Sequence, residues 1–111
     1  MKIKSGASIE GCRGEILKGA ILIEPLFINA GIEMVITSGT KEPHRADRSG
    51  HYRGDGIDVR SNTLKTVEKK KSLLRSIKRK LGPAYVVILE SIGKPWEHYH
   101  IHWSPTLETA I

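Results

Sequence analysis

A polar amphipathic helix followed closely by an apolar strand is the feature that most constrains the fold of this chain. Within residues 62–81 apolar residues recur at helical spacing and form one stripe: Leu64, Val67, Leu74, Ile77 and Leu81. Asn62 or Thr63 can cap the start of this helix, and Gly82-Pro83 ends it. The continuous apolar run at 85–89 then predicts a strand that is buried on both faces.

The other elements follow from similar patterns. Residues 14–29 repeat apolar side chains at near-helical spacing, with Pro25 inside the helix and Gly31 as a C-terminal stop. Short strands are expected at 34–37, 56–60 and 99–103, and residues 39–54 form a long polar loop. This order of elements predicts an α+β fold, with a small, mainly antiparallel sheet and helices packed against it.

Composition indicates a single domain that acts on an anionic partner. With 111 residues and 39% hydrophobic content, residues 1–111 are expected to form one monomeric domain. The lone Cys12 excludes a disulfide framework, and no apolar stretch has the roughly 18 residues that a spanning helix needs. We therefore expect a protein made in the cytoplasm without a signal peptide. The net charge of +6 fits nucleic acid, a membrane surface or an acidic wall polymer.

The basic residues are concentrated in the helix predicted at 62–81. Between positions 65 and 80 eight basic residues face a single acid, Glu68. One interpretation is the solvated side of an amphipathic helix. The other is a surface that holds the protein on anionic wall polymers, lipopolysaccharide or inner-membrane lipid. Charge reversal of Lys69, Lys70 and Lys71 would weaken salt-dependent binding to isolated envelopes only under the second interpretation.

Two short clusters hold most of the metal-capable chemistry. The segments 49–58 and 97–102 contain four of the five histidines. In the first, Gly54 and Gly56 lie between His51 and Asp58, so that a tight turn can bring a loop imidazole beside a strand carboxylate. Asp58 is flanked by β-branched residues and should face the opposite side of its strand from both.

The second cluster supplies a further ligand and a base. His100 and His102 lie two residues apart on a predicted strand, so both side chains leave the same face, and either can be the third ligand. Glu97 would face the other way on an unbroken strand, but a bend at Pro95 and Trp96 can swing its carboxylate toward the metal. A catalytic zinc needs three protein ligands, an open position for water and a nearby carboxylate.

The same residues resemble a known family. The zinc peptidases of the D-alanyl-D-alanine carboxypeptidase and dipeptidase group, which include phage L-alanyl-D-glutamate endolysins (peptidase family M15), carry the pattern Ser-x-His-x-x-Gly-x-Ala-x-Asp and, downstream, Glu or Asp followed after two residues by His. This chain matches the first part of the pattern at Ser49, His51, Gly54 and Asp58. Gly56 stands where the pattern has alanine. Glu97 and His100 match the second part, so the resemblance spans residues 34–103.

The resemblance implies zinc-dependent hydrolysis of peptide bonds in peptidoglycan, by an endopeptidase or a D,D-carboxypeptidase. His51, Asp58 and His100 would hold Zn²⁺, and Glu97 would be the general base. Ser49 would contact substrate, and His102 would support a ligand or bind substrate. Without an export signal, such an enzyme is expected to act at the cell wall as a phage lysis protein or a virion-associated protein.

One part of the family pattern differs in this chain. The family has a Ser-Gly-Tyr-Arg segment before the first ligand, and this chain has Ser38-Gly39-Thr40-Lys41 there. Lysine keeps the charge that binds a substrate carboxylate but lacks the bidentate fork of arginine. Arg45, Arg48 or Arg53 can take the place of the missing arginine. The identity of the cleaved bond depends on which of these cations meets the substrate.

Two other classes of function compete with the hydrolase. In a metal-dependent nucleic-acid enzyme the basic helix would track phosphates, but the few aromatics are not interleaved with the basic run as a stacking platform requires. A catalytically silent wall-binding module would keep the fold without the activity, and the altered Thr40-Lys41 pair is the feature that supports it.

Overall fold

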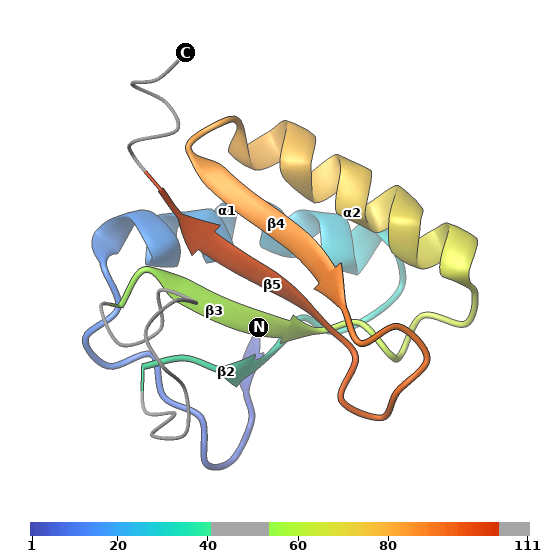
Figure 1. The fold of residues 1–111 in the computed structure, drawn as a ribbon, viewed down its shortest axis with the longest axis horizontal. Helices are drawn as coiled ribbons and strands as arrows, with labels where there is room; N and C mark the ends of the chain where they lie inside the picture. Colours follow the sequence, from blue (N-terminus) through green and yellow to red (C-terminus); the bar gives the residue numbers. More distant parts are fainter. Residues whose placement is uncertain (41–53, 105–111) are drawn as a thin grey trace.

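The computed structural model describes residues 1–40 and 54–104 of the chain. A five-stranded sheet has the strand order β1-β2-β3-β5-β4. Its strands are β1 (Lys2–Ile3), β2 (Val35–Ser38), β3 (Gly56–Arg60), β4 (Tyr85–Glu90) and β5 (His98–Trp103). All neighbouring pairs are antiparallel except β1 and β2, which are parallel. This mostly antiparallel sheet with two helices confirms the predicted α+β fold (Figure 1).

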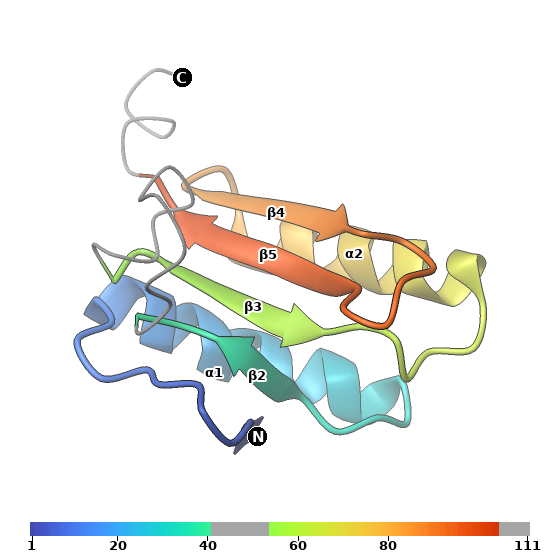
Figure 2. The same ribbon diagram turned by 60° about the horizontal axis from the view of Figure 1, so that its bottom comes forward.

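Both helices, α1 (Gly14–Asn29) and α2 (Val67–Leu81), cover the same face of the sheet (Figure 2). The core lies between these two layers, where Ile23 and Phe27 of α1 and Ile77 of α2 are fully buried. From the sheet, Tyr99 reaches this layer and packs edge-on against Phe27, with ring centroids 6.1 Å apart. Packing on one face leaves the opposite face of the sheet for polar side chains.

Helix α1 begins and ends where the sequence pattern predicts. It spans Gly14–Asn29 and contains Pro25, and its core-facing side includes Ile16 and Ala20. Gly19 allows close packing, since a Cβ there would lie 3.1 Å from the ring of Tyr85. Within residues 1–40 and 54–104 no helix is long and apolar enough to cross a membrane.

Helix α2 starts later than predicted. Its N-cap is Thr66, whose hydroxyl accepts a hydrogen bond from the Lys69 N–H, so the prediction of Asn62 or Thr63 as cap is wrong. Residues 61–66 form turns instead, in which the Leu64 N–H donates to the Ser61 carbonyl. The Asn62 amide donates to the Pro95 carbonyl (2.8 Å) and is therefore used to fix the next turn.

The inward stripe of α2 matches the predicted one only in part: Ile77 is buried and Leu74 and Leu81 pack against the core, as predicted. Leu73 and Ile77 are its buried residues, whereas Val67 is 45% exposed. Leu64 is buried, but it reaches the core from the preceding turn and not from the helix. The later start of the helix explains the difference, because its inward side is set by packing on α1 and β4 and not by the residues of the turn.

Strand β4 is buried on one face only, contrary to the expectation for residues 85–89. It is an edge strand in which Val87 is buried and Ile88 is 44% exposed. Val87 belongs to the core, which lies on the face of the sheet that the helices cover, whereas the next residue, Ile88, lies on the other side of the pleat. Strand β1 was not predicted, because two residues are too short to show a period.

Candidate functional site

The face of the sheet that lies opposite the helices carries the predicted ligands. In β5 the residues His98, His100 and His102 alternate with the core residues Tyr99 and Ile101. The pairing of β3 with β5 sets Asp58 directly across from His100. Ile57 and Val59 are in the core, so the prediction that the Asp58 side chain faces opposite to both neighbours is confirmed. Strand alternation and register thus bring two residues 42 positions apart onto one surface.

Asp58, His100 and His102 form a connected row. The Asp58 Oδ1 and His100 Nδ1 atoms are 3.0 Å apart, and the His100 Nε2 and His102 Nδ1 atoms are also 3.0 Å apart. Asp58 and His100 are 3% and 5% exposed, so their contact is shielded from water, whereas His102 is only partly buried. Because a carboxylate only accepts, the hydrogen bond between Asp58 and His100 is donated by the Nδ1–H of His100.

These donors fit a zinc ion in chemistry, since imidazole and carboxylate are ordinary zinc ligands. Two ligands of a tetrahedral zinc lie about 3.4 Å apart. At 3.0 Å the Asp58–His100 and His100–His102 pairs are somewhat closer, as hydrogen-bonded groups are, so a zinc ion would replace a hydrogen bond. A histidine usually binds a metal ion through one of its two ring nitrogens. His100 can therefore bind an ion that Asp58 also binds, or an ion that His102 also binds. Both His100 and His102 therefore stay open as the third ligand.

The predicted ligand His51 lies outside the described residues, as do Ser49, Lys41 and Arg45. In the part of the chain that the structure describes, no group of three or more His, Cys, Asp or Glu side chains is placed to hold a metal ion. Asp58 and His100 thus form two-thirds of the predicted set.

Both ends of the segment that carries His51 are held by the N-terminal residues 8–13. At one end the Thr40 N–H donates to the Ser8 carbonyl (2.9 Å). At the other end the Arg13 N–H donates to the Gly54 carbonyl (2.8 Å). Gly54 has φ +77°, and a Cβ there would lie 2.3 Å from the Gly11 carbonyl oxygen, so only glycine fits. The sequence therefore fixes where this segment leaves the sheet and where it returns.

Glu97 is bound by donors from three parts of the chain. Its Oε1 accepts from Lys70 Nζ (2.8 Å) and from the Gly93 N–H (2.9 Å), and its Oε2 accepts from Ser61 Oγ (2.5 Å). Burial alone would raise the pKa of Glu97, but these hydrogen bonds and the charge of Lys70 outweigh it and lower the pKa. The carboxylate is thus held charged, with its oxygens directed to these donors.

Glu97 and Asp58 nevertheless border the same cavity. Its volume is about 220 Å³, and Thr37, Arg60 and His98 also line it. Glu97 lies just before β5, at the bend that the sequence predicts at Pro95 and Trp96, where the chain forms a turn. Its role as a base stays a prediction. Oε2 accepts from Ser61 among the described residues, and a carboxylate oxygen can accept a second hydrogen bond, for example from water.

His98 and Glu90 are site residues that the sequence reasoning did not select. The His98 Nδ1–H donates to the Trp96 carbonyl (2.8 Å), and Nε2 lies 2.9 Å from Glu90 Oε1 and 3.6 Å from Asp58 Oδ1. Asp58 is thus flanked by an imidazole on each side. The alternation of histidines at 98, 100 and 102 was the available signal, because it places all three on one face.

Comparisons with known proteins do not identify the chain. No family model matches it, and no curated protein or solved structure matches it with significant similarity. Function is therefore inferred from the residues on the face of the sheet opposite the helices and from their geometry.

Proposed function

We propose that this protein is a zinc-dependent hydrolase of peptide bonds in peptidoglycan stem peptides, of the endolysin endopeptidase or D,D-carboxypeptidase type. The observation that carries the proposal is the pairing of Asp58 with His100 across β3 and β5, with the carboxylate 3.0 Å from the imidazole. These two residues are also the ones that the family pattern assigns to the metal. His51 would complete the ligand set.

The residues of this chain would divide the chemistry among them. Asp58, His100 and His51 would hold the zinc ion, which when bound polarises a carbonyl and lowers the pKa of a water ligand to about 7. Glu97 would take a proton and pass it to the leaving amine. Its lowered pKa keeps Glu97 charged but also makes it a weaker proton acceptor than an ordinary glutamate.

The remaining predicted residues would bind substrate. Lys41 and Arg45 would meet the substrate carboxylate, and Ser49 and His102 would contact the peptide. The protein would act as a monomer at the cell wall, as a lysis or virion-associated protein of a phage, and the basic residues of α2 would hold it near the anionic envelope.

Digestion of purified sacculi, followed by mass spectrometry of the released peptides, tests this proposal. We expect the zinc-loaded protein to release stem peptides, a chelator to stop the release, and added zinc to restore it. The masses of the products would distinguish an endopeptidase from a carboxypeptidase. Cleavage of plasmid DNA without release of peptides would instead identify a nucleic-acid enzyme.

The Glu97→Gln variant tests the role of the base. A positioned general base contributes about 10²–10⁴-fold to rate, so we expect turnover on sacculi to fall by that factor. Zinc content, measured by elemental analysis, should be unchanged, and circular dichroism would establish that the variant is folded. Near-normal turnover would remove Glu97 from the mechanism.

The hydrogen bonds of Glu97 favour a second candidate, a catalytically silent wall-binding domain. Each carboxylate oxygen already accepts at least one hydrogen bond, from Lys70, Gly93 or Ser61. In a silent domain Glu97 would only join α2 to the start of β5. Zinc binding and sacculus binding without hydrolysis of any peptide would support this candidate.

A further inference from the structure

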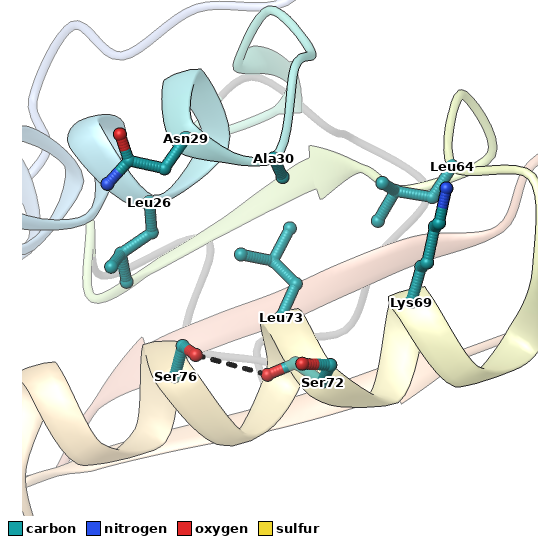
Figure 3. A pocket seen from close by; sticks show the side chains of 8 residues that line it. All are labelled: Leu26, Asn29, Ala30, Leu64, Lys69, Ser72, Leu73 and Ser76. Atoms are coloured by element: carbon teal, nitrogen blue, oxygen red, sulfur yellow. Dashed lines mark hydrogen bonds between the residues drawn. The ribbon is translucent and has the colours of Figure 1, made fainter.

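A cavity lies between the two helices, on the side of the sheet away from Asp58 and His100. It has a volume of about 480 Å³ (Figure 3). Four apolar residues and four polar residues line it: Leu26, Ala30, Leu64 and Leu73, and Asn29, Lys69, Ser72 and Ser76. Leu26 of α1 and Leu73 of α2 point into the space between the helices. The cavity is therefore separate from the proposed hydrolytic site.

The cavity is bordered by α2, and the chain is rich in basic residues in and just before this helix. Eight basic residues lie between positions 65 and 80, and Lys70 is the one bound to Glu97. The others are exposed, and they are Lys65, Lys69, Lys71, Arg75, Lys78, Arg79 and Lys80. Lys69 belongs both to these exposed basic residues and to the lining of the cavity. A ligand that enters here would meet the charge of Lys69 and alkyl side chains of the lining, while the other basic residues lie elsewhere around the helix.

An apolar lining beside a lysine side chain is complementary to an anionic phospholipid. Lysine side chains near an anionic bilayer attract its phosphate groups, whereas alkyl chains fill apolar space. A wall polysaccharide carries the charge but has no alkyl chain to fill the cavity. None of the eight lining residues is aromatic, so the cavity offers no surface on which a nucleic-acid base can stack.

We propose that the α1–α2 layer docks on a membrane surface that contains anionic phospholipid, with Lys69 on a phosphate group and part of a lipid chain in the cavity between Leu26 and Leu73. The exposed basic residues in and just before α2 provide the long-range attraction, and the cavity provides the fixed contact. Docking of this layer leaves the face of Asp58 and His100 directed away from the lipid. This inference is independent of the hydrolase proposal, because it uses neither the metal nor Glu97.

Sedimentation with lipid vesicles tests the proposal on the full chain. We expect binding to vesicles of phosphatidylcholine and phosphatidylglycerol in equal parts, and little binding to vesicles of phosphatidylcholine alone. Binding should weaken as salt is raised, since exposed charges are screened. Equal binding to both vesicles would overturn the proposal. Retention on isolated sacculi without binding to the anionic vesicles would also overturn it, in favour of a wall polymer.

Two matched charge-reversal variants distinguish binding in the cavity from general electrostatic attraction to the membrane. Lys69→Glu and Lys71→Glu change the same charge at exposed positions of one helix, but only Lys69 lines the cavity. We expect Lys69→Glu to weaken vesicle binding at least about fivefold more than Lys71→Glu does. Equal effects would mean that the cavity is not used.

A third variant tests the cavity without any change of charge. Ala30→Gln adds a longer polar side chain at the exposed end of α1, at the edge of the cavity. We expect it to weaken vesicle binding while the thermal unfolding midpoint stays near that of the wild type. Unchanged vesicle binding by a folded Ala30→Gln protein would contradict insertion of a lipid chain.

Discussion

The two faces of β5 have opposite chemistry although their residues alternate along one short strand. On the helix side Tyr99 and Ile101 are buried among apolar residues of the core. On the other side His98, His100 and His102 contact carboxylates or one another. The pleat therefore separates the residues that stabilise the fold from those that could bind a ligand. A substitution on one face should change stability, and a substitution on the other should change chemistry.

The largest stability difference between the faces is expected from Ile101→Ala and His102→Ala. Ile101 is 1% exposed, so its truncation should lower the free energy of unfolding by about 2–5 kcal/mol. His102 is only partly buried, and its loss should cost about 1 kcal/mol because the hydrogen bond with His100 is removed. Denaturant unfolding followed by circular dichroism measures both values. Equal losses of stability in the two variants would mean that the face of the sheet opposite the helices is also part of the packed core.

Lys70→Met tests the contact at the start of β5, where Glu97 links the strand to α2. Loss of one partner from a buried ion pair should lower the free energy of unfolding by about 3 kcal/mol at neutral pH. Ser61 and Gly93 still donate to the carboxylate, which keeps the cost at the lower end of the usual range. Lys71→Met is the matched control, because Lys71 is exposed, and it should change stability by less than about 0.5 kcal/mol.

The same variant has a predicted dependence on pH. The folded-state pKa of Glu97 is lowered below its ordinary value of 4.5, so the charged carboxylate stabilises the fold above that pH. This contribution is lost as the pH falls through the folded-state pKa. Lys70→Met should reduce the loss of stability on acidification, as measured by thermal unfolding from pH 6 to strongly acid conditions. An unchanged slope would show that Lys70 does not lower the pKa of Glu97.

The sequence predicted the parts of the molecule that a short periodic pattern encodes. Helical spacing predicted α1, and strand alternation placed Asp58 opposite to Ile57 and Val59. The His100-x-His102 spacing likewise predicted that both imidazoles lie on one face, which their 3.0 Å contact confirms. In each case the signal is contained within a few consecutive residues.

Contacts between distant residues had no such signal. Ser61 lies 36 positions from Glu97, and Lys70 lies 27 positions from it, so no pattern connects them. In the sequence nothing distinguishes Lys70 from the other lysines of the basic run. Among the described residues, Lys70 is the lysine that pairs with the buried carboxylate of Glu97. The start of α2 was placed too early for the same reason, because tertiary contacts of residues 61–66 outweigh the capping preference of Asn62.

The most direct test of this account is a measurement of zinc affinity by competition with a chromophoric chelator. It compares the wild type with variants of the predicted ligands on the face of the sheet opposite the helices. We expect the wild type to bind one zinc ion, and Asp58→Asn and His100→Gln each to weaken binding by more than about 100-fold, beyond the loss typical of a residue that only supports a ligand. If His102 is the ligand in place of His100, His102→Gln will show the larger loss. A wild type that binds no zinc, or Asp58→Asn and His100→Gln proteins that bind it as tightly as the wild type, would contradict the account.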